Sequence, residues 1–145
     1  MQLDDPEEPG DHIDAATMNL EEVSGVSYRY ALDNGTTTSS VQGSLSWTAI
    51  KDAEDSNDEV VKQGAATGRD TCEITAVGSA GFVVDLQAGS TVNYGDSGGP
   101  VSLKQYDIGG SSYGLVGGIV SGDDSNGNTW ICAMPAIEDE FDVVV

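Results

Sequence analysis

The sequence predicts an all-β domain, folded as a barrel or a sandwich. Three observations support this: short segments alternate apolar and polar residues, turn signals separate them, and six or more such segments follow Val23. The chain has 145 residues, which suits one domain with a sizeable core. We expect an acidic arm over residues 1–22 and the β domain over residues 23–145.

The first strands are predicted by alternation. Residues 26–32 alternate apolar and polar side chains, as in a half-buried strand, and Asn34-Gly35 then offers a tight turn. The alternation returns over residues 41–47, which predicts another strand. Residues 52–59 are mostly charged and lack an apolar period, so we expect a loop there.

The second half of the chain predicts further strands and one helix. Strands are expected from Val60 onward and at 73–77, 81–86 and 114–120. Asn126-Gly127 separates the last of these from the β-prone residues 129–134, which predicts a hairpin. Pro135 closes the hairpin, and residues 136–141 are expected to form a short helix.

The charge of the chain excludes several classes of protein. Five basic and 25 acidic residues give a net charge of −20, so a nucleic-acid partner is not expected. The Asp-rich, Lys-poor composition resembles that of proteins from extreme halophiles, in which molar salt shortens the Debye length to ~3 Å and screens self-repulsion. The alternative is an ordinary acidic secreted protein.

The apolar residues do not indicate a membrane segment. No stretch of ~18 apolar residues occurs, so no membrane partner is expected. The residues after Met1 do not resemble a signal peptide.

One glycine-rich segment has the composition of a catalytic loop. Residues 95–100 read Gly-Asp-Ser-Gly-Gly-Pro. Glycines on both sides of Ser97 permit an unusual turn and leave the serine accessible. Consecutive N–H groups in such a turn can converge on one point and stabilise the negative charge that a carbonyl oxygen gains during acyl transfer. Ser97 is then suited to be the nucleophile. The alternative is that the whole segment is only a structural loop, which Asp96 closes.

These six residues resemble the nucleophile motif of chymotrypsin-like serine peptidases. The bacterial-type members of that family offer two further similarities, at residues 114–122 and 61–77, so the resemblance covers residues 40–141. It implies a six-stranded antiparallel Greek-key barrel of the trypsin-like type, the second of two barrels. Residues 1–22 are then a remnant of the first barrel, and the substrate is a peptide or protein.

The resemblance assigns roles around the nucleophile. Ser97 matches the nucleophile, and the N–H groups of Gly95 and Ser97 match the oxyanion hole. Asp96 matches the buried carboxylate that orders this hole and needs a cationic partner. In the bacterial-type pattern that partner is a basic residue just after the position of Val61, which makes Lys62 the candidate. The alternative for Lys62 is an ordinary surface lysine.

The resemblance also implies a substrate pocket. Thr91 lies six residues before the nucleophile, where the family sets its primary specificity, and because it is not acidic, cleavage after Lys or Arg is not implied. Ser121 matches a serine that supports the carboxylate of the catalytic triad, and Gly122 follows it. Trp130 lies where these enzymes carry an aromatic residue near the pocket.

The base of the triad has no counterpart in this sequence. Asp14 fits the triad carboxylate loosely, whereas the single histidine, His12, does not match the position of the catalytic histidine. We therefore expect the chain alone to be nearly inactive. It is either the C-terminal part of a longer, secreted or cell-surface peptidase whose N-terminal barrel is missing, or an inactive barrel that binds or supports other molecules.

No cofactor or metal is expected. One histidine makes a zinc site improbable, and the acidic residues 52–59 and 123–124 do not have the spacing of a calcium loop. Cys72 and Cys132 are compatible with one disulfide or with two separate buried thiols, and base rates favour the thiols.

Overall fold

The computed structural model describes residues 13, 15, 40–86, 92–103, 106–108, 111–123 and 128–143. These residues form eight strands and two helices. The strands are β1 (Ser40–Ser44), β2 (Glu59–Gly64), β3 (Gly68–Val77), β4 (Gly81–Leu86), β5 (Pro100–Leu103), β6 (Tyr106–Ile108), β7 (Ser111–Asp123) and β8 (Asn128–Ala133). The helices are α1 (Trp47–Ser56) and α2 (Met134–Phe141).

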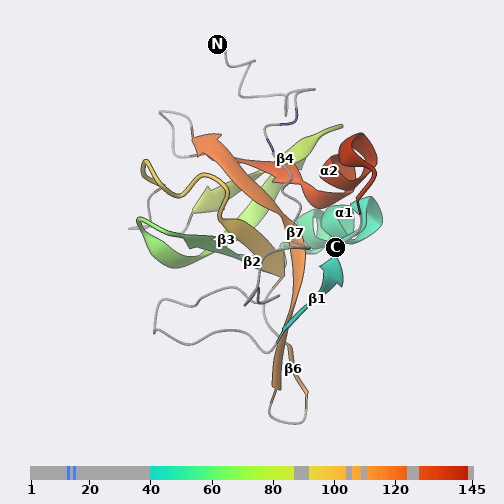
Figure 1. Cartoon of the computed structure of the whole chain (residues 1–145). Helices are drawn as coiled ribbons and strands as arrows, with labels where there is room; N and C mark the ends of the chain where they lie inside the picture. The colour runs from blue at the N-terminus through green and yellow to red at the C-terminus, as the bar shows by residue number, and fades with distance from the viewer. Residues whose placement is uncertain are drawn as a thin grey trace, which may run out of the picture.

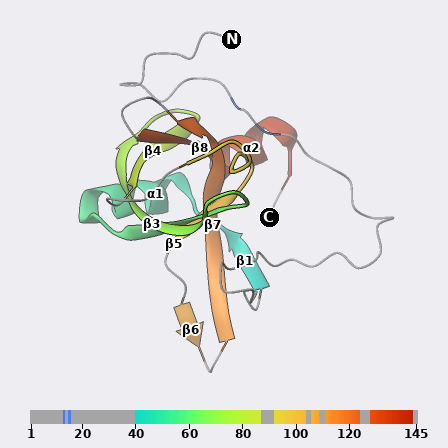
Figure 2. The ribbon, with the colours of Figure 1, turned by 90° about the vertical axis from the view of Figure 1, so that its left-hand side faces the viewer.

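Six of the strands close into a barrel. Their order is β7-β5-β2-β3-β4-β8, and β8 pairs with β7 again to complete the ring. Every pairing around the ring is antiparallel, and Figure 2 shows the strands curving around a common interior. Strand β1 pairs in parallel with β7 outside the ring. Strand β6 pairs with the first residues of β7, and the two project from the barrel (Figures 1 and 2). Of the two predicted architectures, the barrel is confirmed.

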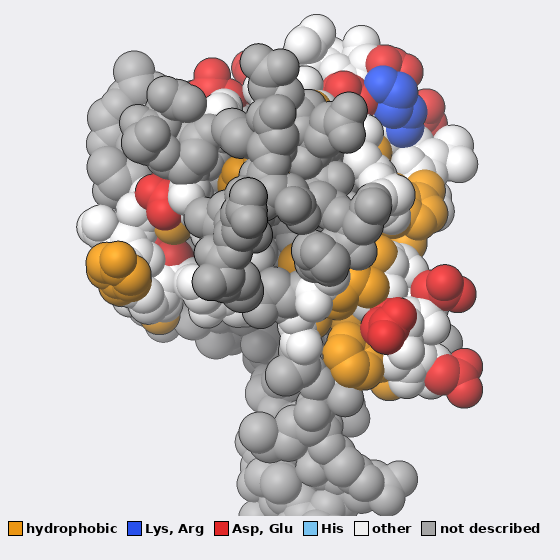
Figure 3. Space-filling view, turned by 90° about the horizontal axis from the view of Figure 1, so that it is seen from above, with side chains coloured by type: hydrophobic (Ala, Val, Ile, Leu, Met, Phe, Trp, Pro, Cys, Tyr) orange, Lys and Arg blue, Asp and Glu red, His pale blue; other side chains and the backbone are white. Residues whose placement is uncertain are grey.

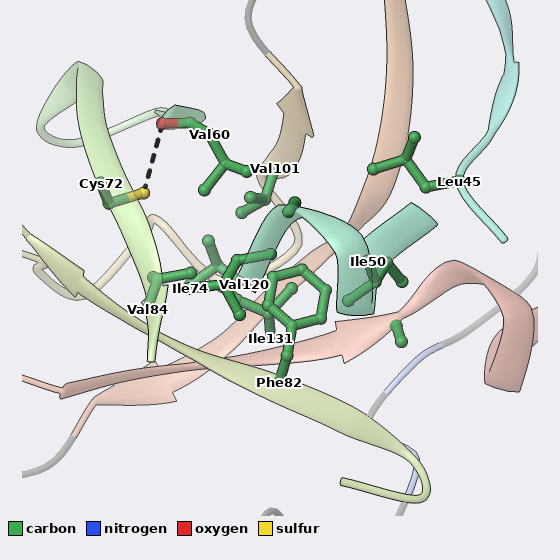
Figure 4. Close-up of a cluster of buried hydrophobic side chains, with 12 residues drawn as sticks. Leu45, Ile50, Val60, Cys72, Ile74, Phe82, Val84, Val101, Val120 and Ile131 are labelled. Atoms are coloured by element: carbon green, nitrogen blue, oxygen red, sulfur yellow. Dashed lines mark hydrogen bonds between the residues drawn. The ribbon is translucent and has the colours of Figure 1, made fainter. Parts of the chain in front are cut away.

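The interior of the barrel is filled by one apolar cluster (Figure 4). Its buried members come from every strand of the ring, from α1 and from the link between β1 and α1: Leu45, Ile50, Ala53, Val60, Cys72, Ile74, Phe82, Val84, Val101, Val120, Ile131 and Ala133. Full burial of a branched aliphatic or Phe side chain contributes roughly 1.5–3 kcal/mol, so this cluster is the main source of the barrel's stability.

Helix α1 overturns two of the sequence expectations. The strand expected over 41–47 ends at Ser44, and the loop expected over 52–59 is largely helical. Ser46 caps the helix by accepting a hydrogen bond from the N–H of Ala49 at 3.2 Å, and Asn57 ends it in the left-handed conformation. The charged residues that suggested a loop occupy the solvent side of the helix, because only Ile50 and Ala53 face the core.

The other expectations for the second half of the chain hold in most cases. Strand β4 has the predicted bounds, and β2 begins one residue before Val60. β7 and β8 pair as the predicted antiparallel hairpin, although its turn residues lie outside the described part. Helix α2 begins at Met134, two residues earlier than predicted, because Pro135 is compatible with the first turn of a helix. The strand predicted at 26–32 also lies outside the described residues.

A second apolar cluster packs on the outside of the barrel. Its buried members, on β7, β8 and α2, are Val116, Cys132, Met134 and Ile137. Four partly buried residues pack against them: Ile13, Ala15, Val41 and Ile119. Two residues of the predicted acidic arm, Ile13 and Ala15, therefore contribute to this outer face of the barrel.

The cysteines are separate buried thiols. Cys72 belongs to the interior cluster, where its thiol lies 3.6 Å from the carbonyl oxygen of Val60 (Figure 4). Burial raises the pKa of the Cys72 thiol to about 12. Cys132 belongs to the outer cluster, and both cysteines are free. The alternative of a disulfide between them is wrong.

The described surface carries much of the negative charge. Figure 3 shows acidic side chains spread over the described part of one face rather than gathered in a single patch. Their mutual repulsion weakens as salt rises, because exposed charges farther apart than a Debye length are screened. Within the described ranges, no helix combines the length and apolar character required to span a bilayer.

Candidate active site

The loop that carries Ser97 is fastened to the barrel at its C-terminal side. Described residues 92–99 precede β5, which begins at Pro100. The N–H of Gly98 donates to the carbonyl of Val120 at 2.8 Å, and the N–H of Val120 donates to the carbonyl of Gly99 at 2.9 Å. Because Val120 is a core residue of β7, these two bonds fix the loop relative to the barrel.

A tight turn precedes the serine. The N–H of Asp96 donates to the carbonyl of Asn93 at 3.0 Å, which closes a turn over residues 93–96. Gly95, at the third position, has a φ of +104°, whereas Tyr94 does not have a positive φ. This combination is typical of a type II turn, in which the peptide between the second and third residues is flipped relative to type I. That peptide carries the N–H of Gly95, so the positive φ sets the direction of this N–H.

Ser97 and two N–H groups are left available by this arrangement. The side chain of Ser97 is exposed, and so is Gly95. Among the described residues, the N–H groups of Asp96, Gly98 and Gly99 donate to backbone oxygens, whereas those of Gly95 and Ser97 donate to none. Within the described part of the chain, the loop therefore presents an exposed hydroxyl and two N–H groups that have no backbone acceptor, as an acyl-transfer site requires.

Asp96 anchors the loop to the turn between β2 and β3. Its side chain is fully buried and accepts four hydrogen bonds. Oδ1 accepts from the N–H groups of Ala66 and Thr67 at 2.9 and 3.0 Å. Oδ2 accepts from the hydroxyl of Thr67 at 2.6 Å and from the N–H of Asn93 at 3.0 Å. Burial by itself raises the pKa of Asp96, but these hydrogen bonds outweigh it and lower the pKa to about 2.

Lys62 is the cation beside Asp96. It is fully buried, so the alternative of a surface lysine is wrong. Its Nζ donates to the hydroxyl of Thr67 at 2.6 Å and lies 3.3 Å from Asp70 Oδ2 and 3.8 Å from Asp96 Oδ2. Its charge is therefore balanced by two carboxylates, as a buried ammonium requires.

The sequence of β2 explains how the carboxylate reaches this position. Successive residues of a strand point to opposite faces, so Val60, Lys62 and Gly64 share one face of β2. Val60 lies in the apolar core, and Lys62 lies two residues nearer the loop. A Cβ at Gly64 would lie 2.0 Å from Asp96 Oδ1, so only glycine at this position leaves room for the carboxylate.

The structure brings some of the predicted pocket residues near the loop. Ser121 and Gly122 follow Val120 directly on β7 and are half-buried. Trp130 of β8 pairs with Gly122 and is also half-buried. Thr91, Asp14 and His12 lie outside the described residues.

The role of Thr67 was missed from the sequence. Thr67 lies in the turn between β2 and β3, within the string that resembled the bacterial-type enzymes, yet the resemblance gave it no role. A hydroxyl in a turn between Gly64 and Gly68, close in sequence to a candidate buried lysine, is the signal that could have identified it. The same turn supplies the N–H of Ala66.

The described part of the chain lacks a base for Ser97 of the kind found in serine peptidases, because it contains no histidine. It also lacks any group of three or more His, Cys, Asp or Glu side chains placed to hold a metal ion. No protein-family model matches the chain, and comparisons with curated proteins and with solved structures give no significant match either.

Proposed function

We propose that this chain is the nucleophile-bearing barrel of a serine endopeptidase of the trypsin-like Greek-key type, which forms an acyl-enzyme on Ser97. One observation carries the proposal: Asp96 is buried and hydrogen-bonded next to a turn in which Ser97 is exposed and the N–H groups of Gly95 and Ser97 have no backbone acceptor among the described residues. Lys62, Asp96, Asp70 and Thr67 form a charge cluster that fixes the conformation of this loop, as an oxyanion hole requires.

In the proposed reaction, Ser97 Oγ attacks the carbonyl carbon of a peptide bond while its proton passes to a general base. The carbonyl oxygen becomes negatively charged and accepts hydrogen bonds from Gly95 and Ser97. The base then returns the proton to the leaving amine, and water later hydrolyses the ester. The proposed base is a histidine that this sequence does not contain at the family's position and that comes from another part of the protein. Asp14 is the proposed carboxylate that orients it.

The proposal extends to the surroundings of the loop. Thr91, Ser121, Gly122 and Trp130 are the proposed walls of the substrate pocket. A first barrel on another part of the protein is the proposed partner that completes the site, in an extracellular or cell-surface enzyme. The closed antiparallel ring supports the proposed fold type, because it supplies one barrel of the two that this family uses.

A second candidate function is an inactive barrel of the same ancestry that binds or supports other molecules. The observation in its favour is the lack of a histidine among the described residues. Under this reading the charge cluster below the loop is retained for stability alone, and Ser97 is an ordinary exposed serine without enhanced reactivity.

Phosphonylation of Ser97 distinguishes the two candidates. The purified chain is incubated in multimolar KCl with a fluorophosphonate, with and without added imidazole as a substitute base, and the adduct is read by intact mass. Attack by Ser97 Oγ forms an O–P bond, breaks the P–F bond with release of fluoride, and passes the hydroxyl proton to imidazole or water. We expect a slow adduct that imidazole accelerates, because oxyanion-hole donors alone retain part of the catalytic effect.

Two variants make this result specific. Ser97→Ala is expected to abolish the adduct, whereas Ser56→Ala, which removes an exposed hydroxyl at the end of α1, is expected to leave it unchanged. Circular dichroism in the same buffer shows that each protein is folded. A folded wild-type chain with no Ser97-dependent adduct, even with imidazole, would contradict the peptidase proposal and favour the inactive barrel.

A further inference from the structure

We propose that Thr67 is a positioning residue that couples the buried ammonium of Lys62 to the carboxylate of Asp96. It thereby holds in place the oxyanion loop, which is the loop of residues 92–99 that carries the proposed oxyanion hole. The part of this inference that concerns the oxyanion loop rests on the proposed function. The coupling itself is a property of the charge cluster and is tested separately.

The distances assign Thr67 this role. Lys62 Nζ is 3.8 Å from Asp96 Oδ2, which is too long for a direct hydrogen bond. The Thr67 hydroxyl lies 2.6 Å from Lys62 Nζ and 2.6 Å from Asp96 Oδ2, so it bridges the two charges. The N–H of Thr67 donates to the other carboxylate oxygen at 3.0 Å. Two of the four donors to Asp96 therefore come from this one residue.

The chemistry of the three groups fixes the direction of both bonds. An ammonium has donors and no acceptor, so the Thr67 hydroxyl must accept from Lys62. A hydroxyl has only one proton, which leaves that proton for Asp96. Charge-assisted bonds of this kind are short, and each polarises the next in a chain. The remaining neighbours of Lys62 are Asp70 Oδ2 at 3.3 Å and the carbonyl of Gly68 at 3.5 Å.

The position of Asp96 in the sequence carries this coupling to the proposed oxyanion hole. Asp96 lies between Gly95 and Ser97, whose N–H groups are the proposed donors to the substrate. The peptide N–H of Ser97 is bonded directly to the carbonyl carbon of Asp96. A displacement of the buried carboxylate therefore moves the backbone on both sides of it, and the two donors lose their common target.

A matched pair of threonine variants tests the inference. Thr67→Val removes the bridging hydroxyl and keeps the shape of the side chain, and Thr67→Ser restores the hydroxyl. Thr129→Val is the control, because Thr129 is fully buried and its hydroxyl has no hydrogen-bond partner within the described atoms. Two quantities are measured in multimolar KCl: the pKa of Asp96 from the carbon-13 shift of its carboxyl group, and the rate of phosphonylation of Ser97.

We expect Thr67→Val to raise the pKa of Asp96 by about one pH unit or more, because a hydrogen bond to a charged group is lost. It should also slow the labelling of Ser97 about tenfold or more. Thr67→Ser should restore both quantities, and Thr129→Val should change neither. An Asp96 pKa that is the same in Thr67→Val and wild type overturns the coupling.

The two readouts separate this inference from the proposed function. If wild type shows no Ser97-dependent label, the peptidase proposal fails, and the Asp96 titration alone still decides the coupling. If labelling is normal but Thr67→Val slows it no more than Thr129→Val does, the link from Thr67 to the hole is overturned. If Thr67→Val does not fold, Lys62→Met replaces it in the titration. That variant should also raise the pKa of Asp96, and an unchanged value overturns the coupling.

Discussion

Two inward-facing residues of β2 lie in regions of opposite chemistry. Val60 packs among aliphatic side chains and Phe82. Two residues later, the fully buried Lys62 lies beside Asp96, Asp70 and Thr67. The apolar region tolerates many arrangements of similar volume, because its contacts have little directional preference. The polar region has only one satisfactory arrangement, since every donor and acceptor requires its partner. The first region therefore supplies most of the stability, and the second fixes the conformation of one loop.

The largest effect is expected when the polar region loses its carboxylate. Asp96→Ala leaves four donors without an acceptor and removes one of the two carboxylates near Lys62. Breaking a buried charge pair in this way should lower the free energy of unfolding by about 4 kcal/mol. Urea unfolding in multimolar KCl measures this value. Asp123→Ala, at an exposed carboxylate, is the control, and an equal loss in both variants would argue against the special role of Asp96.

A smaller loss is expected in the apolar region, with a different consequence for the loop. Ile50 is fully buried, so Ile50→Ala should lower the free energy of unfolding by about 3 kcal/mol through loss of contacts and formation of a cavity. The same variant, while folded, should show the wild-type rate of Ser97 phosphonylation. Urea unfolding and intact mass measure the two quantities. A loss of labelling larger than the loss in Asp96→Ala would reverse the distinction between the two regions.

Acid should weaken the polar region selectively. The folded-state pKa of Asp96 is about 2, below the ordinary value of 3.8 for an aspartate, so its contribution to stability is complete above pH 4 and is lost as the pH falls through 2. The difference corresponds to about 2 kcal/mol. Urea unfolding of wild type and Asp96→Asn between pH 5 and pH 2 isolates this contribution from the other carboxylates. We expect the difference between the two proteins to shrink toward low pH, and a constant difference would show that the charge of Asp96 is not stabilising.

The smallest effect concerns the helix that covers the apolar region. Ser46→Ala removes the hydrogen bond to the N–H of Ala49 and should lower the free energy of unfolding by about 1 kcal/mol. Ser56→Ala, at the other end of α1, should change it by less than ~0.5 kcal/mol. Thermal and urea unfolding of both variants give the comparison. Equal effects at the two serines would mean that the cap does not contribute to the stability of α1.

Local patterns predicted β2, β4, β7 and β8 but gave only the second half of β3, and they missed β5, β6 and the first helix. The bounds of β4 follow from a run of apolar residues that is buried at most positions, and the β7–β8 pairing follows from an Asn-Gly turn. Helix α1 was missed because only Ile50 and Ala53 face the core, so the helical periodicity of its apolar residues is weak and its charged residues suggested a loop. The capping serine Ser46 is the signal that could have identified the helix.

The candidate site was predicted where a short motif determines it. Gly95 and Ser97 occupy the loop that the motif implied, and Lys62 lies beside Asp96 although the two are far apart in sequence. Thr67 could not be assigned in this way, because its function depends on the exact separation of two buried charges. That separation is set by the packing of β2 against the loop, which no local pattern encodes.

The outer cluster that joins Ile13 and Ala15 to β7, β8 and α2 has a consequence for how the chain folds. Its contacts link residues that are separated in sequence by nearly the whole barrel, so they raise the contact order of the protein. Closure of so long a loop is entropically unfavourable and is offset only once α2 has packed. During synthesis, Ile13 and Ala15 leave the ribosome long before Met134 and Ile137. They therefore remain without their final partners until translation of the barrel is complete.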